Sequence, residues 1–164
     1  MVAMLLAFTA CKQEKEDLIF YVVKAADLPA DAAESTLLGI AEEQGRAAFT
    51  AEDIDHWYWE TQQITLKEVA VRGGNGSSGS SLFQADAEDT FVLALGNRVL
   101  LWGGFENNVG ALAVDRELYI ADDDEGDSFH IQCRKSYEQA NDPRRVEALY
   151  EFLADHHLLA SEAQ

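Results

Sequence analysis

Hydrophobic residues along this chain gather in short runs separated by polar turns, a pattern typical of β-strands. The run Leu18–Val23 is β-branched and aromatic, which predicts a strand buried on both faces. Two apolar runs, Phe91–Leu95 and Arg98–Trp102, flank Gly96-Asn97 and predict a hairpin with a two-residue turn. Four weaker runs predict further strands: Trp57–Trp59, Ile64–Leu66, Glu117–Ile120 and Ser128–Ile131.

Helical periodicity is confined to segments near the two ends. Apolar residues recur at helical spacing from Asp31 to Gln44, with Gly45 where a helix would stop. Thr50–Asp53 resembles a capping box and predicts a short helix before Trp57. A last helix is predicted to begin at Asp142-Pro143, with one stripe against the sheet: Val146, Leu149, Tyr150, Leu153 and His157.

Strands in succession, with helices near both ends, predict an α+β fold. We expect a mostly antiparallel β-meander sheet, with one helix after the first strand and a second at the C-terminus. The 164 residues suit one domain, which we place at 18–160.

Charge narrows the possible partners. The chain has 12 lysines and arginines against 30 aspartates and glutamates, a net charge of −18. Such a field repels phosphate backbones and anionic membrane surfaces, which disfavours nucleic-acid binding and electrostatic membrane adsorption. The sequence also lacks the 18 or more consecutive apolar residues of a typical transmembrane helix. Any membrane attachment is therefore expected to be through a lipid.

The first 17 residues resemble the end of a bacterial lipoprotein signal peptide and its tether. An apolar decamer, Met1–Ala10, stops at Cys11 and is followed by the charged residues 12–17. The resemblance implies cleavage before Cys11 and acylation of its thiol, so residues 1–10 are a signal-peptide remnant and 11–17 the lipidated tether. Phe8 departs from the usual aliphatic residue, and no lysine or arginine precedes the apolar run, as if the start codon lay further upstream. The alternative is a buried N-terminal strand or helix.

Two segments, one rich in glycine and one rich in carboxylates, have compositions found in ligand-binding loops. Gly74–Gly79 fits G-x-G-x-x-G, but no long periodic helix follows it, so we interpret 72–81 as a flexible loop. Carboxylates crowd 122–127, and Asp122, Asp124 and Asp127 are weak candidates for a cation site. The EF-hand spacing fails there, and a solvated hairpin tip is the plainer interpretation.

We find no catalytic constellation, no zinc motif and no cofactor motif in the sequence. The thiol of Cys133 and the imidazole of His130 are three positions apart on a strand, which puts them on opposite faces. The remaining candidates are aromatic residues near glycines such as Gly103-Gly104, which can line a ligand groove or simply form core. They are Trp57, Trp59, Trp102 and Phe105.

The ordered patterns from Leu18 to Leu159 resemble a family of small bacterial lipoproteins and exported proteins. The segments that carry the resemblance are Thr50–Asp55, Trp57–Trp59, Ile64–Leu66, Phe91–Phe105 and Asp142–Arg145. The family has no assigned activity, so the resemblance transfers no site residue.

These observations predict a lipid-anchored protein of the cell envelope, whose acidic domain has a binding or structural role toward a protein or small ligand. The alternative is a cytoplasmic adaptor or immunity-like protein whose acidity attracts a basic partner. An enzyme is the least favoured interpretation, because nucleophile, base and oxyanion donors are not found together.

Overall fold

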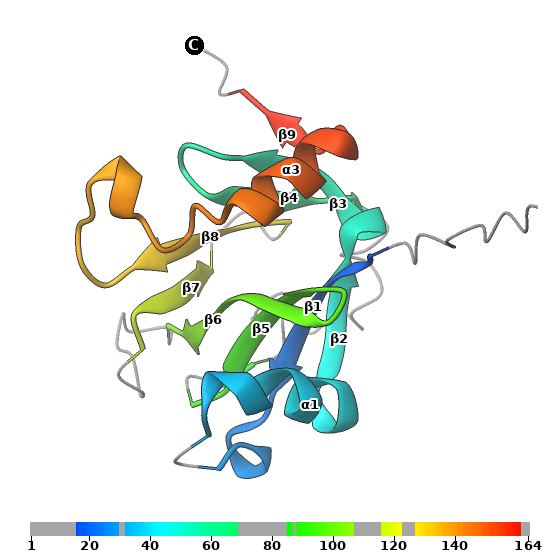
Figure 1. Ribbon diagram of the computed structural model, residues 1–164, viewed down its shortest axis with the longest axis vertical. Helices are drawn as coiled ribbons and strands as arrows, with labels where there is room; N and C mark the ends of the chain where they lie inside the picture. The colour runs from blue at the N-terminus through cyan, green and yellow to red at the C-terminus, as the bar shows by residue number, and fades with distance from the viewer. Residues whose placement is uncertain are drawn as a thin grey trace, which may run out of the picture.

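The computed structural model describes residues 16–29, 32–68, 85–86, 88–106, 116–122 and 127–161, and the side chains of Ala121 and Asp122 are not described. Nine strands form one mixed sheet that curls into a half-barrel, in the order β2-β1-β5-β6-β7-β8-β4-β3-β9 (Figure 1). The strands are β1 (Leu18–Val23), β2 (Arg46–Thr50), β3 (Ile54–Tyr58), β4 (Gln63–Leu66), β5 (Thr90–Leu95), β6 (Arg98–Phe105), β7 (Leu118–Asp122), β8 (Ser128–Cys133) and β9 (Leu159–Ala160).

Two α-helices lie wholly within the described residues, α1 (Glu34–Gln44) and α3 (Glu147–Asp155). Short 3-10 turns occur at Ala25–Asp27, Ala51–Asp53 and Gln139–Asn141. The turn at Ala51–Asp53 has the capping box that the sequence predicted, because the backbone N–H of Thr50 donates to Asp53 Oδ2 at 2.8 Å. Figure 1 shows α1 and α3 at opposite ends of the sheet.

The prediction of an α+β fold with a mostly antiparallel meander is wrong. The protein is mostly β, and its sheet is mixed, because β6 pairs in parallel with β7 and β3 pairs in parallel with β9. Strands β3 and β4 form an antiparallel hairpin, but β4 then pairs with β8 rather than with β5. The chain thus leaves the growing sheet after β2 and completes it from the other edge.

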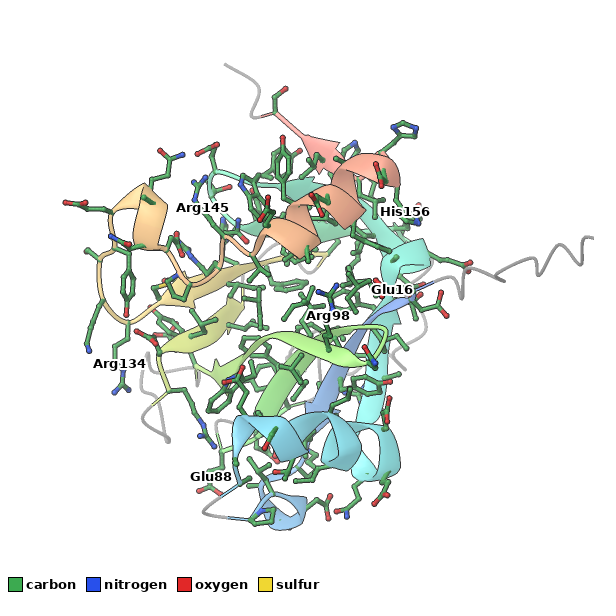
Figure 2. All side chains as sticks on the ribbon, viewed as in Figure 1. Glu16, Glu88, Arg98, Arg134, Arg145 and His156 are labelled. Carbon is green, nitrogen blue, oxygen red and sulfur yellow. The ribbon has the colours of Figure 1, made fainter. Side chains whose placement is uncertain are left out.

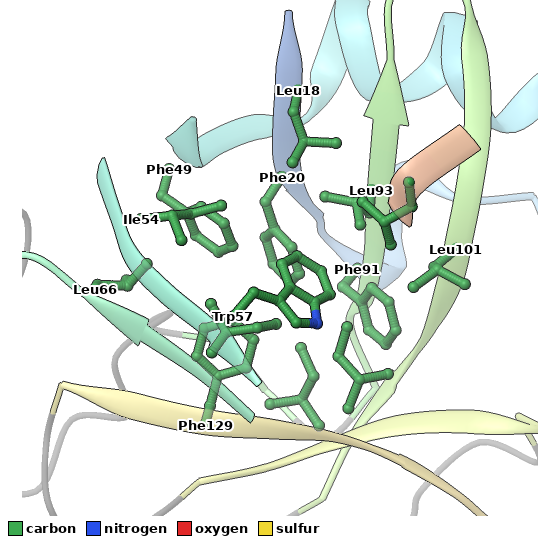
Figure 3. Packing of buried hydrophobic residues seen from close by; sticks show 14 of the residues in the cluster. Leu18, Phe20, Phe49, Ile54, Trp57, Leu66, Phe91, Leu93, Leu101 and Phe129 are labelled. Atoms are coloured by element: carbon green, nitrogen blue, oxygen red, sulfur yellow. The ribbon is translucent and has the colours of Figure 1, made fainter. Parts of the chain in front are cut away.

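The larger core fills the concave side of the half-barrel. Trp57 lies at its centre, fully buried, with Phe20, Phe91 and Phe129 around it (Figure 3). The rings of Phe20 and Phe91 stack with centroids 5.5 Å apart. Helix α3 closes this core with three buried side chains, Leu149, Phe152 and Leu153.

A smaller core lies on the opposite face of β1 and β5, under α1. Leu37 and Ala41 of the helix meet Val23 and Val92 of these strands. Along β1 the residues alternate between the two cores, since Phe20 and Val22 face the larger one and Val23 faces α1. Strand β5 is buried throughout its length for the same reason.

The stripe predicted for the last helix is only partly correct. The helix begins at Glu147 rather than at Asp142-Pro143. Its buried face is centred on Leu149, Phe152 and Leu153, so Phe152 lies in the core and Tyr150, one residue after Leu149, points outward and is 45% exposed. His157 follows the helix with a φ of 57°, and the bonds His157 N–H to Ala154 O and Leu158 N–H to Leu153 O form a Schellman motif.

A buried carboxylate joins the end of β1 to the start of β5. Asp89 accepts hydrogen bonds from Lys24 Nζ at 2.7 Å and from the backbone N–H groups of Ala25 and Asp86. Burial raises the pKa of Asp89, but these hydrogen bonds outweigh it and hold the pKa below its usual value. The cluster is therefore an ionised structural link.

Candidate functional site: a cationic cavity beside β7 and β8

The register of the β7–β8 hairpin places four ionic residues together. Leu118, the first residue of β7, pairs with Cys133, the last residue of β8. The chain that leads into β7 therefore lies beside the chain that leaves β8, and the N–H of Arg134 donates to the carbonyl of Glu117 at 2.9 Å. Arg116 and Glu117 on one side thus meet Arg134 and Lys135 on the other.

These four side chains line a cavity of about 240 Å³, which we call the cationic cavity. Three of the four carry a positive charge, although carboxylates outnumber cations by 30 to 12 in the whole chain. Glu117, Arg134 and Lys135 are exposed, whereas Arg116 is half-buried.

The guanidinium group of Arg116 packs against the ring of Trp102. Its guanidinium carbon lies 4.9 Å from the centroid of the Trp102 ring, a cation–π contact. The Arg116 Nε is buried and has no hydrogen-bond partner among the described residues. The guanidinium is therefore positioned by packing, while part of its hydrogen-bonding capacity is unused by the described part of the chain.

A second polar cluster follows the cavity along the chain. The guanidinium of Arg144 donates to both carboxylate oxygens of Asp142, from Nε to Oδ1 at 2.9 Å and from Nη2 to Oδ2 at 2.6 Å, and Nη1 donates to the carbonyl of Ile131 at 2.9 Å. The side chain of Asp142 is only 7% exposed. Hydrogen bonds from Arg144 hold the pKa of Asp142 below its usual value, so this ion pair fixes the segment before α3 to β8.

Cys133 lies between the cavity and this ion pair. Its Sγ–H donates to Asp142 Oδ1 at 3.7 Å. Desolvation by burial, with smaller contributions from Asp142, raises the pKa of the Cys133 thiol to about 11 despite the opposing charge of Arg144. A thiol with this pKa is protonated at neutral pH and is a poor nucleophile.

We expect Cys133 to be alkylated slowly. In a chain carrying Cys11→Ala, Cys133 is the only thiol. The rate at which iodoacetamide alkylates Cys133 should rise about tenfold per pH unit until it levels off near pH 11. Mass spectrometry measures these rates, and circular dichroism shows whether the protein stays folded. The urea-unfolded chain is the control, with a plateau above the ordinary thiol pKa of about 8.5. A folded protein whose rate levels off by about pH 9 would contradict the burial argument.

The aromatic groove candidates separate into two groups. Trp57 and Phe105 belong to the larger core, where each is buried, and so do not face a groove. Trp59 is half-buried and packs edge-on against Tyr150, with ring centroids 5.1 Å apart. Trp102 alone of the four lies next to the cationic cavity, through Arg116.

The other predicted sites fall mainly outside the described residues. Cys11 and the signal-peptide remnant lie there, as do the loop 72–81 and Asp124 of the acidic turn. Asp122 ends β7, and Asp127 precedes β8 with its carbonyl accepting the N–H of Leu66. Among the described residues, no three His, Cys, Asp or Glu side chains gather in a way that suits a metal ion.

The cationic cavity was not predicted from the sequence. Its only local signal is a pair of charged residues where one predicted strand begins and a basic pair after the next: Arg116-Glu117 and Arg134-Lys135. The signal becomes informative only when the register of the β7–β8 hairpin is known, since a shift of one residue would turn the side chains to other faces.

No family model, curated protein or solved structure matches this chain. The function of the cationic cavity is therefore argued from its own residues and geometry. Within the described residues, no helix combines the length and the apolar character needed to cross a membrane.

Proposed function

We propose that the protein is a lipid-anchored binding protein of the bacterial cell envelope. The support for the anchor is the sequence: Cys11 follows an apolar decamer and precedes a charged tether. Strand β1 begins at Leu18, seven positions after Cys11, so an acyl chain on this cysteine would hold the domain close to the membrane surface. The protein is not proposed to be an enzyme.

The cationic cavity is the observation that carries the binding role. It is a concave site whose four lining residues are all charged, and it lies beside the paired ends of β7 and β8. The nearest nucleophile is Cys133, whose Sγ–H donates a hydrogen bond to Asp142 Oδ1. Its raised pKa keeps the thiol protonated at neutral pH, which favours binding over covalent chemistry at this end of the sheet.

Detergent-phase partitioning tests the anchor. The full-length protein, expressed in bacteria with its natural upstream region, is expected to enter the detergent phase, and Cys11→Ala is expected to abolish this because the acylated thiol is lost. Cys133→Ala is the matched control, since it removes the other cysteine, and it should partition like the parent. Equal partitioning of the parent and Cys11→Ala would overturn the anchor.

An acidic adaptor or immunity-like protein in the cytoplasm is the second candidate, and the exposed face of α3 favours it. Glu147, Glu151 and Asp155 recur every four residues there, beside the exposed ring of Tyr150. Like charges at this spacing repel by about 0.2–0.5 kcal/mol per pair, and a basic partner would relieve that repulsion. Loss of the anchor in the partitioning test would make this the leading function.

A further inference from the structure

We infer that the cationic cavity binds a small oxyanion, a phosphate or carboxylate group, between Arg116, Arg134 and Lys135. The inference rests on the binding role proposed above and specifies the class of ligand. Guanidinium and ammonium groups have only donors, and arginine in particular matches the two oxygens of a carboxylate or phosphate.

The fold brings the three cations together before any ligand arrives. Arg116 precedes β7, and Arg134 and Lys135 follow β8, so the pairing of Leu118 with Cys133 fixes their separation. The Trp102 ring supports the Arg116 guanidinium from one side, which lowers the conformational entropy lost when an anion binds. Such preorganisation distinguishes the cavity from scattered surface lysines and arginines.

The acidity of the whole chain does not prevent anion binding at this place. At physiological ionic strength the Debye length is about 8 Å, so exposed carboxylates farther away are largely screened. Within the cavity, three cations face one carboxylate, Glu117. Glu117 is therefore the group expected to oppose an oxyanion and to limit its affinity.

The size of the cavity selects a small ligand. Pockets for drug-sized molecules and cofactors have volumes of about 300–1,000 Å³, whereas this cavity has about 240 Å³. A free phosphate, a short carboxylic acid or a single phosphate headgroup suits that space better than a nucleotide does. A lipid headgroup and a free anion present the same chemistry, and the experiment separates them.

Titration of the full chain carrying Cys11→Ala tests the inference without the anchor. Sodium phosphate and sodium acetate replace sodium chloride at constant ionic strength, and two-dimensional NMR follows the Trp102 indole N–H, assigned with Trp102→Phe. Saturable shifts with either anion are expected. Sedimentation with vesicles of phosphatidylglycerol, against phosphatidylcholine alone, shows whether a lipid headgroup is the preferred source.

Three substitutions are expected to change the affinity for the anion in three different ways. Arg116→Gln should weaken binding of the responding anion or vesicle by about tenfold or more, since charge-assisted hydrogen bonds are lost. Glu117→Gln should strengthen it by about threefold, because a repelling surface charge is removed. Arg98→Gln is the matched control: Arg98 is an exposed residue at the hairpin end of β6, 3.8 Å from Glu16 and away from Arg134 (Figure 2), and its removal should leave affinity unchanged.

The inference is overturned if phosphate, acetate and phosphatidylglycerol vesicles all fail to bind, or if Arg116→Gln and Arg98→Gln weaken binding equally. If Arg116→Gln does not fold, Glu117→Gln decides, and unchanged or weaker binding by that variant overturns the inference. Because these measurements use a chain without Cys11, their failure is separate from failure of the anchor in the partitioning test.

Discussion

Replacing Trp57 by alanine is expected to lower the free energy of unfolding by about 3–5 kcal/mol. Trp57 is fully buried at the centre of the larger core (Figure 3), so its removal leaves a cavity among rings that are held by strands on both sides. The indole Nε1–H also donates to the Oε1 of Gln62 at 3.3 Å, and this buried acceptor would lose its donor. Urea unfolding followed by circular dichroism measures the loss.

Trp59→Ala is the matched control for this prediction. Trp59 is half-buried and its ring contacts Tyr150, which is itself 45% exposed. Less apolar surface returns to water and the site is open to solvent, so we expect a loss of about 1 kcal/mol. Equal losses for the two tryptophans, or a loss below about 1.5 kcal/mol for Trp57→Ala, would contradict the central place of Trp57 in the core.

The turn that holds Trp57 shows a limit of sequence interpretation. Gln62 is fully buried, and its Nε2–H donates to the carbonyl of Trp59 at 2.6 Å. Its φ of 58° is unusual for a residue with a side chain. The sequence Glu60–Gln63 reads as a solvated turn, because nothing in the local pattern shows that Trp57 needs an acceptor on that side.

Features that depend on neighbouring residues were predicted correctly. The β5–β6 hairpin forms around Gly96-Asn97, and Gly96 has the positive φ, 55°, that a tight turn favours. The capping box at Thr50–Asp53 is likewise present. In both cases the residues that determine the conformation lie within a few positions of one another.

The sheet order was not predictable in the same way. Strand β9 pairs in parallel with β3, about 100 residues earlier in the chain, and the consecutive strands β6 and β7 pair in parallel rather than as a hairpin. Hydrophobic alternation shows which face of a strand is buried, but it does not identify the neighbouring strand. Consecutive strands are neighbours in only about two-thirds of cases, and the meander prediction failed where β4 pairs with β8.

The candidate site also combines a residue that the sequence singled out with residues that only the strand pairing brings together. Trp102 was singled out from the sequence as an aromatic that could line a ligand site, and it does support Arg116. The three cations of the cavity were not found, because they meet only through the pairing of β7 with β8. Charge counted along the chain shows an acidic protein, whereas the cationic character of the cavity exists only in the folded state.

Gly103→Ala is expected to destabilise the protein by about 2–3 kcal/mol, because added atoms in a packed region force strain. Gly103 pairs with Phe91 in β5, just where β6 turns to meet β7. A Cβ there would lie 2.6 Å from Cε1 of Phe91, and closer still to the carbonyl oxygen of Leu118. The ring belongs to the core and the carbonyl to the backbone, so neither can move away without disturbing the β6–β7 junction.

The adjacent glycine provides the control. A Cβ on Gly104 would meet only the Cγ and Cβ of Arg116, at 3.4 and 3.8 Å, which are ordinary contacts. Gly104→Ala should therefore change the free energy of unfolding by less than about 0.5 kcal/mol, or raise it slightly through the entropy of the unfolded chain. Thermal and urea unfolding of both variants give the comparison. If the two alanines lower the free energy of unfolding equally, the close approach of Leu118 and Phe91 to Gly103 is wrong.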